Sequence, residues 1–435
     1  MTVWPLPRIS FRELGSIQEK RPVALLTTEQ TWAILGSQIA LPLVIQAEPE
    51  RVDLDLFEYL AAHLPSQVEA VYVIGQGAPL EAGKIVASRN NVPLIVVPTA
   101  LESDAPYKAT ATVYKKDEDG QIVSQTIETG PATEVIIDWD VIKAAPDSLR
   151  GAGIVDVISI ITGLLDWRYA AQRGKNPPEQ RFTPWAASVA AGLAAHAIKS
   201  APAIGEGKPA GLRTLLDLLM EITQLGNQLG HTRVQEGGEH LLAEALAAQD
   251  THKLSHAEIV GPCILLVSAL HGQDPASLRD AMESAGVKLD RLRAPDVQSF
   301  IDNLPEYVGM HALPYSILND LDPLAEDTAQ ALRTAGLAIL PGTWQSPDLV
   351  IEEVEEEAAA PVVQAQAEAE PAVEEAAPPD EEATRPEPTG AAAEAAIVPE
   401  QETLPEDAPR EAVPNGAASD AAGDDDEAKG SSPTV

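Results

Sequence analysis

Three side chains in the middle of the chain have the chemistry of metal ligands. Asp156 lies in the apolar run GIVDVISII, where an unpaired buried carboxylate would be costly. His240 precedes LLAEALAA and His256 lies in SHAEIVG, with His252 one helical turn before it. From residue types alone, a metal site and ordinary structural histidines both stay open. If one Asp and two His converge, they suit Zn²⁺ or Fe²⁺ and leave a coordination position for a substrate hydroxyl.

A glycine turn is the second feature that could do chemistry. The apolar run VYVIG leads into Gly75-Gln76-Gly77, and a helical pattern begins near Pro79. Glycines at a strand-to-helix turn let the backbone approach a pyrophosphate, whose charge the helix N-terminus favours. An empty tight turn has the same sequence, so both interpretations stay open here.

The third feature is the polar group Glu102-Ser103-Asp104, which follows the apolar run VPLIVVPT at residues 92–99. In open parallel sheets, ligands bind beyond the carboxyl ends of the strands. A capping aspartate in a surface loop would look the same.

The elements that must position these groups differ between two parts of the chain. The first part alternates strand and helix patterns, which predicts a parallel sheet with helices on both faces. The segment at 109–129, with Asp119-Gly120 at its centre, reads as an inserted β-hairpin. A helical pattern follows, with breaks at Asn176-Pro177-Pro178 and at 205–211. The predicted strands lie at 23–28, 42–47, 71–75, 92–99 and 134–138, and the predicted helices include 53–64, 79–90, 153–171 and 212–230.

The charge is concentrated at the C-terminus. The chain has 435 residues with 67 acidic and 29 basic side chains. Residues 351–435 hold 24 of those acidic side chains, 3 of the basic ones and no Phe, Trp or Tyr. Such a segment buries too little apolar surface to offset its ordering entropy, so we expect a disordered Ala/Glu/Pro-rich tail at 346–435. A solubilising role is favoured over a docking arm, and its partner is unknown.

Composition also excludes several classes of protein. The single cysteine, Cys263, rules out a disulfide framework or a cysteine-rich zinc site and favours the cytoplasm. The acidic balance argues against nucleic acid as a partner. We expect no signal peptide and no membrane span. Homo-oligomerisation is compatible with the sequence.

Taken in order, these motifs resemble the iron-containing alcohol dehydrogenase superfamily, which includes glycerol dehydrogenase and dehydroquinate synthase. The resemblance runs from about residue 20 to 340. It rests on PTALESDAPYKATATVY, GAGIVDVISIITGLLDWRYA, GGEHLLAEAL and SHAEIVG. The second and third of these segments, and the ending YSILNDL, are most similar to the sn-glycerol-1-phosphate dehydrogenase branch.

The resemblance implies an α/β dinucleotide-binding domain at 1–146, an all-α metal-binding domain at 147–345 and an active site in the cleft between them. It implies a metal-dependent NAD- or NADP-linked dehydrogenase that oxidises or reduces a small polyol or polyol phosphate. Asp104, beside the substrate hydroxyls, and His252 are the predicted catalytic residues. The predicted metal ligands, for Zn²⁺ or Fe²⁺, are Asp156, His240 and His256. The predicted cofactor residues are Gly75, Gly77, Ala78, Pro79, Thr99, Lys108, Thr110 and Tyr114.

The sequence departs from the family pattern mainly on the cofactor side. Gln76 replaces a glycine, Glu81 an aspartate, and Glu102 and Lys108 replace small residues that are usually serine. Lys108 could contact a cofactor phosphate or block the nicotinamide pocket. These changes motivate a second interpretation, a non-catalytic relative that binds a ligand or partner. A cyclase like dehydroquinate synthase is a weaker third, because that branch uses several basic residues for its anionic substrate.

Overall fold

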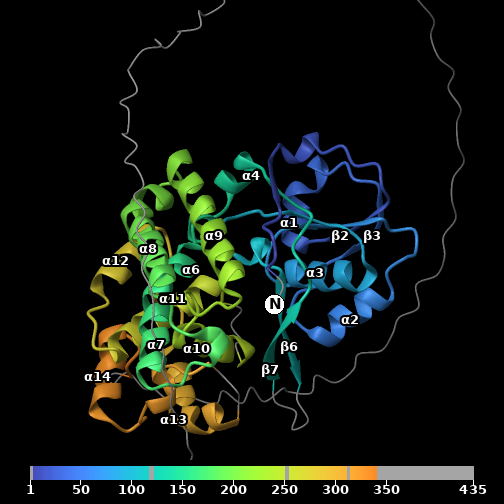
Figure 1. Ribbon diagram of the computed structural model, residues 1–435. Helices are drawn as coiled ribbons and strands as arrows, with labels where there is room; N and C mark the ends of the chain where they lie inside the picture. The colour runs from blue at the N-terminus through green and yellow to red at the C-terminus, as the bar shows by residue number, and fades with distance from the viewer. Residues whose placement is uncertain (1–2, 117–121, 250–253, 311–313, 340–435) are drawn as a thin grey trace, which may run out of the picture. The chain divides into compact units, whose positions relative to one another are not determined.

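A six-stranded parallel sheet forms the first part of the protein (Figure 1). The computed structural model describes residues 3–116, 122–249, 254–310 and 314–339. The strand order is β1-β8-β5-β4-β2-β3, so the chain crosses over between β2 and β3 on one side and β4, β5 and β8 on the other. The strands are β1 (Arg8–Phe11), β2 (Val23–Leu26), β3 (Leu43–Ala47), β4 (Ala70–Ile74), β5 (Leu94–Val97) and β8 (Glu134–Ile137).

The strands predicted from the sequence include all those that are fully buried in the structure. All residues of β2, β4, β5 and β8 are buried, as expected for central parallel strands covered on both faces. Alternate residues such as Tyr72 and Val73 enter separate apolar cores on the two faces of the sheet. The edge strand β1 was not predicted, because its residues are exposed or half-buried and it lacks an apolar run.

Helices cover the sheet and cap its strand ends. Asp53 caps α2 by accepting a hydrogen bond from the backbone N–H of Leu56, and Asp138 caps α4 in the same way. The structure confirms α2 and α3 close to their predicted positions and adds α1, which was not predicted. The elements are α1 (Glu29–Leu35), α2 (Leu54–Ala62), α3 (Ala78–Asn90) and α4 (Trp139–Ala144), with short 3₁₀ turns at Leu14–Ser16, Gly36–Gln38 and Ala105–Tyr107.

The inserted hairpin is also confirmed. Strands β6 (Thr110–Lys116) and β7 (Ile122–Glu128) pair antiparallel in register, from Thr110 opposite Glu128 to Lys116 opposite Ile122. The predicted turn at Asp119-Gly120 lies outside the described residues. The hairpin contacts α2 and α3 through β6 and α10 through β7, so it links the sheet to the helical part (Figure 1).

Helices alone make up the rest of the described chain. Breaks in this part fall at the predicted Asn176-Pro177-Pro178 and between Gly205 and Pro209. The apolar core of one sheet face continues into these helices. They are α5 (Asp147–Arg150), α6 (Ile154–Ile158), α7 (Ile160–Gln172), α8 (Pro184–Gly205), α9 (Pro209–Leu229), α10 (Gly238–Gln249), α11 (His256–Leu270), α12 (Ala276–Ser284), α13 (Ala294–Met310) and α14 (Glu326–Ala335), with 3₁₀ turns at Pro178–Gln180 and Ile317–Asp320.

One stretch, Asp147–Gln172, is long and apolar enough to cross a membrane by length and composition alone. It comprises α5, α6 and α7, and 67% of its most apolar window is buried inside the protein. Core helices of folded proteins meet the same criterion. The domain boundaries predicted at residues 146 and 345 stay predictions, and the predicted tail at 346–435 lies outside the described residues.

Helix α8 contains two glycines whose surroundings differ sharply. A Cβ at Gly205 would lie 2.0 Å from the carbonyl oxygen of Ser284, whereas a Cβ at Gly192 would meet nothing within 4 Å. We therefore expect Gly205→Ala to lower the free energy of unfolding by about 3 kcal/mol through overpacking. The matched change Gly192→Ala should raise it by about 0.5–1 kcal/mol, because alanine favours a helix interior. Urea denaturation midpoints test both changes, and shifts in the same direction would contradict this account of α8.

Candidate active site

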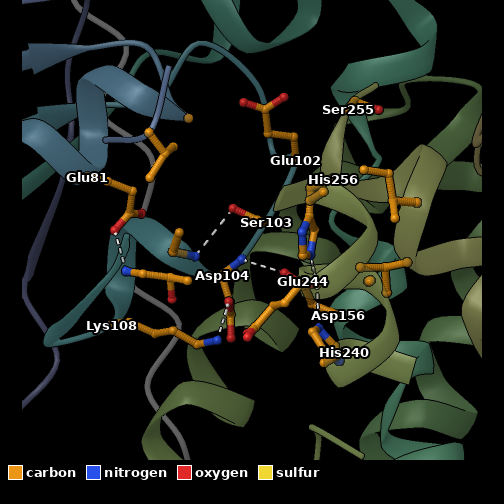
Figure 2. Close-up of a pocket in the computed structure, with 18 of the residues that line it drawn as sticks. Glu81, Glu102, Ser103, Asp104, Lys108, Asp156, His240, Glu244, Ser255 and His256 are labelled. Atoms are coloured by element: carbon orange, nitrogen blue, oxygen red, sulfur yellow. Dashed lines mark hydrogen bonds and ion pairs between the residues drawn. The ribbon is translucent and has the colours of Figure 1, made fainter. Parts of the chain in front are cut away.

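A cavity of about 410 Å³ lies where the strand ends, the hairpin and the helical part meet. Its lining combines the turn after β4, the loop after β5, the hairpin strand β6 and the helices α10 and α11. Figure 2 shows the polar side chains that face it. The ionisable lining residues are Glu81, Lys84, Glu102, Asp104, Lys108, Tyr114, Asp156, Glu236, His240, Glu244 and His256.

All three predicted metal ligands converge at one end of this cavity. Asp156 comes from α6, His240 from α10 and His256 from the first turn of α11, and one ligand atom of each lies within 4.8 Å of the others. His256 Nε2 lies 2.7 Å from Asp156 Oδ1, and His240 Nε2 lies 3.8 Å from the same oxygen. The elements therefore bring together an oxygen and two imidazole nitrogens from three parts of the sequence.

The backbone fixes Asp156 in this position. Its second oxygen, Oδ2, accepts a hydrogen bond of 2.9 Å from the backbone N–H of Asp104. This hydrogen bond requires the loop after β5 to approach the start of α6 closely, and Gly153 permits that approach. A Cβ at Gly153 would lie 2.8 Å from the carbonyl oxygen of Leu101. Burial opposes ionisation of Asp156, but the neighbouring His256 and His240 outweigh it and hold its pKa well below the usual range.

Glu239, which the sequence analysis did not assign, orients His240. Its Oε1 lies 3.0 Å from His240 Nδ1 and also accepts the backbone N–H of Gly237 at 2.7 Å. A carboxylate on one ring nitrogen directs the other toward a ligand position, which is how outer carboxylates tune metal-binding histidines. The only sequence signal was its place directly before His240.

We expect Glu239→Gln to weaken metal binding by about 10- to 100-fold, because the amide is a weaker acceptor for the imidazole N–H. Competition with a chromogenic chelator measures this affinity directly. The control is Glu283→Gln on the exposed side of α12. Equal affinities in the two variants would contradict the role assigned to Glu239.

Lys108 joins the two sides of the cavity beside the metal-ligand cluster. Its Nζ lies 3.0 Å from Asp104 Oδ1 and 2.8 Å from Glu236 Oε1. Gln235 Nε2 donates to the other Asp104 oxygen at 2.9 Å. Lys108 therefore contacts carboxylates. From the sequence, we expected Lys108 to contact a cofactor phosphate or to block the nicotinamide pocket.

The charges of this bridge stabilise one another. Burial alone would lower the pKa of Lys108, but Asp104 and Glu236 outweigh it and raise that pKa well above its usual value. Burial likewise opposes ionisation of Glu236, yet the Lys108 ammonium lowers its pKa to about 2. Burial raises the pKa of the Asp104 carboxyl.

The glycine turn after β4 leaves room for a ligand. Gly77 is the N-cap of α3 with a φ of 62°, and a Cβ there would meet nothing within 4 Å. The Gln76 side chain is 7% exposed and donates to the carbonyl oxygen of Ala100. It lies inside the protein and does not line the cavity, so it leaves the space beside Gly77 open.

Glu81 and Lys84 extend the same wall. Glu81 accepts the backbone N–H of Thr112 at 3.0 Å and lies 3.3 Å from Lys84 Nζ. Lys84 is buried and donates to the carbonyl oxygen of Thr110 at 2.8 Å. Glu81, which departs from the family pattern, and Lys84, which was not singled out, therefore both connect α3 to the hairpin.

Glu102, in the loop after β5, also departs from the family pattern. In Figure 2 the Glu102 carboxylate points away from Asp104.

The predicted site residues divide into two groups. His252 lies outside the described residues. Four of the others lie beside the cavity without lining it: Gly75 in the turn after β4, Ala78 and Pro79 at the start of α3, and Thr99 in the loop after β5. Those that line the cavity are Gly77, Asp104, Lys108, Thr110, Tyr114, Asp156, His240 and His256.

Comparison with known proteins supports the resemblance seen in the sequence. Residues 11–146 match the family described as iron-containing alcohol dehydrogenase. Over this part, the chain is similar to iron-containing alcohol dehydrogenases. This agreement confirms the family resemblance and the fold class that it implied.

Two curated relatives carry the name glycerol-1-phosphate dehydrogenase (NAD(P)+). One, from Methanothrix thermoacetophila, is 27% identical over 298 residues, which cover 66% of this chain and 79% of the relative. Another, from Pyrococcus horikoshii, is 29% identical over 214 residues, which cover 49% of this chain and 59% of the relative. The match to the second therefore spans little more than half its length.

Two solved glycerol dehydrogenase structures share the fold of this chain. A probable glycerol dehydrogenase from Sinorhizobium meliloti superimposes with a TM-score of 0.57 at 17% identity, covering 77% of this chain and 98% of its own. Glycerol dehydrogenase from Schizosaccharomyces pombe gives 0.55 at 15% identity, covering 77% and 90%. At these identities the likeness establishes the fold.

Proposed function

We propose that this protein is a metal-dependent, NAD(P)-linked dehydrogenase that interconverts a small polyol and its carbonyl form. One observation carries the proposal. Asp156, His240 and His256 converge within 4.8 Å in a cavity whose other end reaches the open glycine turn of α3. The names of the curated relatives support the same reaction class.

The residues present fit both groups that this reaction needs. One carboxylate and two imidazoles form an oxygen and nitrogen set that suits Zn²⁺, with Fe²⁺ as the competitor. Gly77 and the first turn of α3 provide space and backbone N–H groups for a pyrophosphate. When bound, the metal would polarise a substrate hydroxyl and the nicotinamide would exchange a hydride.

The chain's own groups would then bind and orient the substrate. Asp104 lies beside Asp156, with its carboxylate held between Lys108 and Gln235, so its oxygens are fixed as acceptors for substrate hydroxyls. Glu239 holds the His240 ring. A cytoplasmic location is part of the proposal, because the lone Cys263 is buried and suits a reducing compartment.

The test uses the full chain, stripped with a chelator and reloaded with Zn²⁺ or Fe²⁺. We expect nicotinamide absorbance to change when glycerol, dihydroxyacetone or a related polyol is added. This change should disappear when the metal is removed with the chelator and return when metal is added back. If bound metal is stoichiometric but neither nicotinamide reacts with any alcohol, the proposal is wrong and the chain is the non-catalytic relative considered above. If nicotinamide is bound and product forms without net reduction, the cyclase interpretation replaces it.

A further inference from the structure

The substrate end of the cavity is walled by hydrogen-bond acceptors. Asp104, Glu236 and Glu244 line it beside the Asp156 cluster. Glu244 is half-buried and accepts a hydrogen bond of 2.9 Å from Ser124 Oγ, and burial together with the neighbouring Glu236 raises the pKa of its carboxyl. Ionised carboxylates accept hydrogen bonds and donate none, so this wall recognises donors.

The ammonium groups on this wall already have carboxylate partners. Among the described lining residues these are Lys84, which pairs with Glu81, and Lys108, which bridges Asp104 and Glu236. With a divalent metal bound, the carboxylates of Asp104, Glu236 and Asp156 already match the charges of Lys108 and the metal, and Glu244 adds a further carboxyl. A phosphate group would add about two negative charges and acceptor oxygens to a space that has no excess positive charge.

We propose that the substrate is an uncharged polyol, and that the Asp104–Lys108–Glu236 bridge selects it against its phosphate esters. The hydroxyl groups of a polyol donate to the carboxylate oxygens. A phosphate ester must instead displace a carboxylate from Lys108 or lie against Asp104 and Glu236 uncompensated. The proposal rests on the dehydrogenase function proposed above, and it separates this chain from the reaction that the names of its curated relatives describe.

The bridge also gives the structural reason for lysine at position 108. A small residue there would leave Asp104 and Glu236 facing one another across the cavity without a cation. Lys108 instead holds both carboxylates in place through contacts of 3.0 and 2.8 Å. Lys108 and Glu236 are thus positioning residues for Asp104 and for the acceptor wall.

The experiment compares glycerol with glycerol 1-phosphate, and dihydroxyacetone with its phosphate, on the metal-loaded full chain. We expect kcat/KM to favour the uncharged compound by about 100-fold or more, since like-charge contacts cost several kcal/mol. Equilibrium dialysis of the same pairs, without nicotinamide, should give the same ranking. Turnover or binding that favours the phosphate ester would overturn the inference.

Two variants locate the selectivity. Glu236→Gln removes one negative charge and keeps a hydrogen-bond acceptor for Lys108. It should lower the ratio of kcat/KM for the uncharged compound to kcat/KM for its phosphate ester by about 10-fold or more. The matched change Glu221→Gln, on an exposed position of α9, should leave the ratio unchanged. An unchanged ratio in Glu236→Gln would also overturn the inference. If no alcohol is oxidised, the proposed dehydrogenase function fails, while the dialysis ranking still decides the class of ligand.

Discussion

Replacing His240 with alanine is expected to empty the metal centre. Wild-type protein should hold close to one zinc or iron per chain after loading, and the variant should bind it more than about 100-fold less tightly. The reason is that His240 supplies one of three converging ligand atoms, and even outer-sphere partners are worth 10- to 100-fold. Dehydrogenase activity should fall to background. Mass spectrometry of bound metal and a chelator competition provide the measurements.

A matched variant separates this effect from a general loss of histidine. His196→Ala changes an exposed residue of α8 and should retain wild-type metal content. Asp156→Asn should behave like His240→Ala, because the amide cannot supply the anionic oxygen. Stoichiometric metal in His240→Ala would show that the ion binds elsewhere and would end the proposed assignment.

The largest stability effect is expected at Asp166 in α7. This carboxylate is fully buried and accepts the backbone N–H groups of Gly238 and Ile317, each at 2.7 Å, while His271 Nε2 lies 2.9 Å away. Asp166→Ala would leave these donors buried without a partner, at about 1–3 kcal/mol each. We expect a loss of roughly 3–5 kcal/mol and a fall in Tm of roughly 10 °C.

Calorimetry and urea denaturation test this prediction. The control, Asp217→Ala, removes an i,i+4 pair with Arg213 in which both side chains are about half exposed, so its effect should stay below about 1 kcal/mol. Asp166→Asn keeps one acceptor oxygen and should fall between the two. An unchanged Tm for Asp166→Ala would mean that water or a neighbouring group replaces the carboxylate.

The sequence was most informative where burial is two-sided. The runs that became β2, β4 and β5 are continuously apolar and short, and that length favours a buried strand over a buried helix. Strand β1 has no such run, because an edge strand needs only one partner and one covered face. Its residues pair with residues of β8 that lie 126 positions away, which no local pattern encodes.

In the site, the sequence indicated which residue types could act, but not where their side chains point. Asp156 stood out because a carboxylate in an apolar run needs a partner, whereas His240 was assigned as a ligand through the family resemblance. Gln76 replaces a family glycine in the turn, and its side chain donates to the Ala100 carbonyl, a partner 24 residues away. Lys108 lies against Glu236, a partner 128 residues away. Long polar side chains follow their tertiary partners, and those partners are invisible before the fold is known.

The pairing of β1 with β8 has a consequence for synthesis of the chain on the ribosome. Arg8 lies opposite Glu134, so β1 leaves the ribosome before its partner β8 and must wait for it. At about 5–20 residues per second, that wait is roughly 6–25 s. Until then, the positive charges of Arg8 and Arg12 disfavour pairing with a wrong edge. When Glu134 emerges, its carboxylate binds both arginines, at 2.5 and 2.6 Å, and the nascent sheet acquires its final edge.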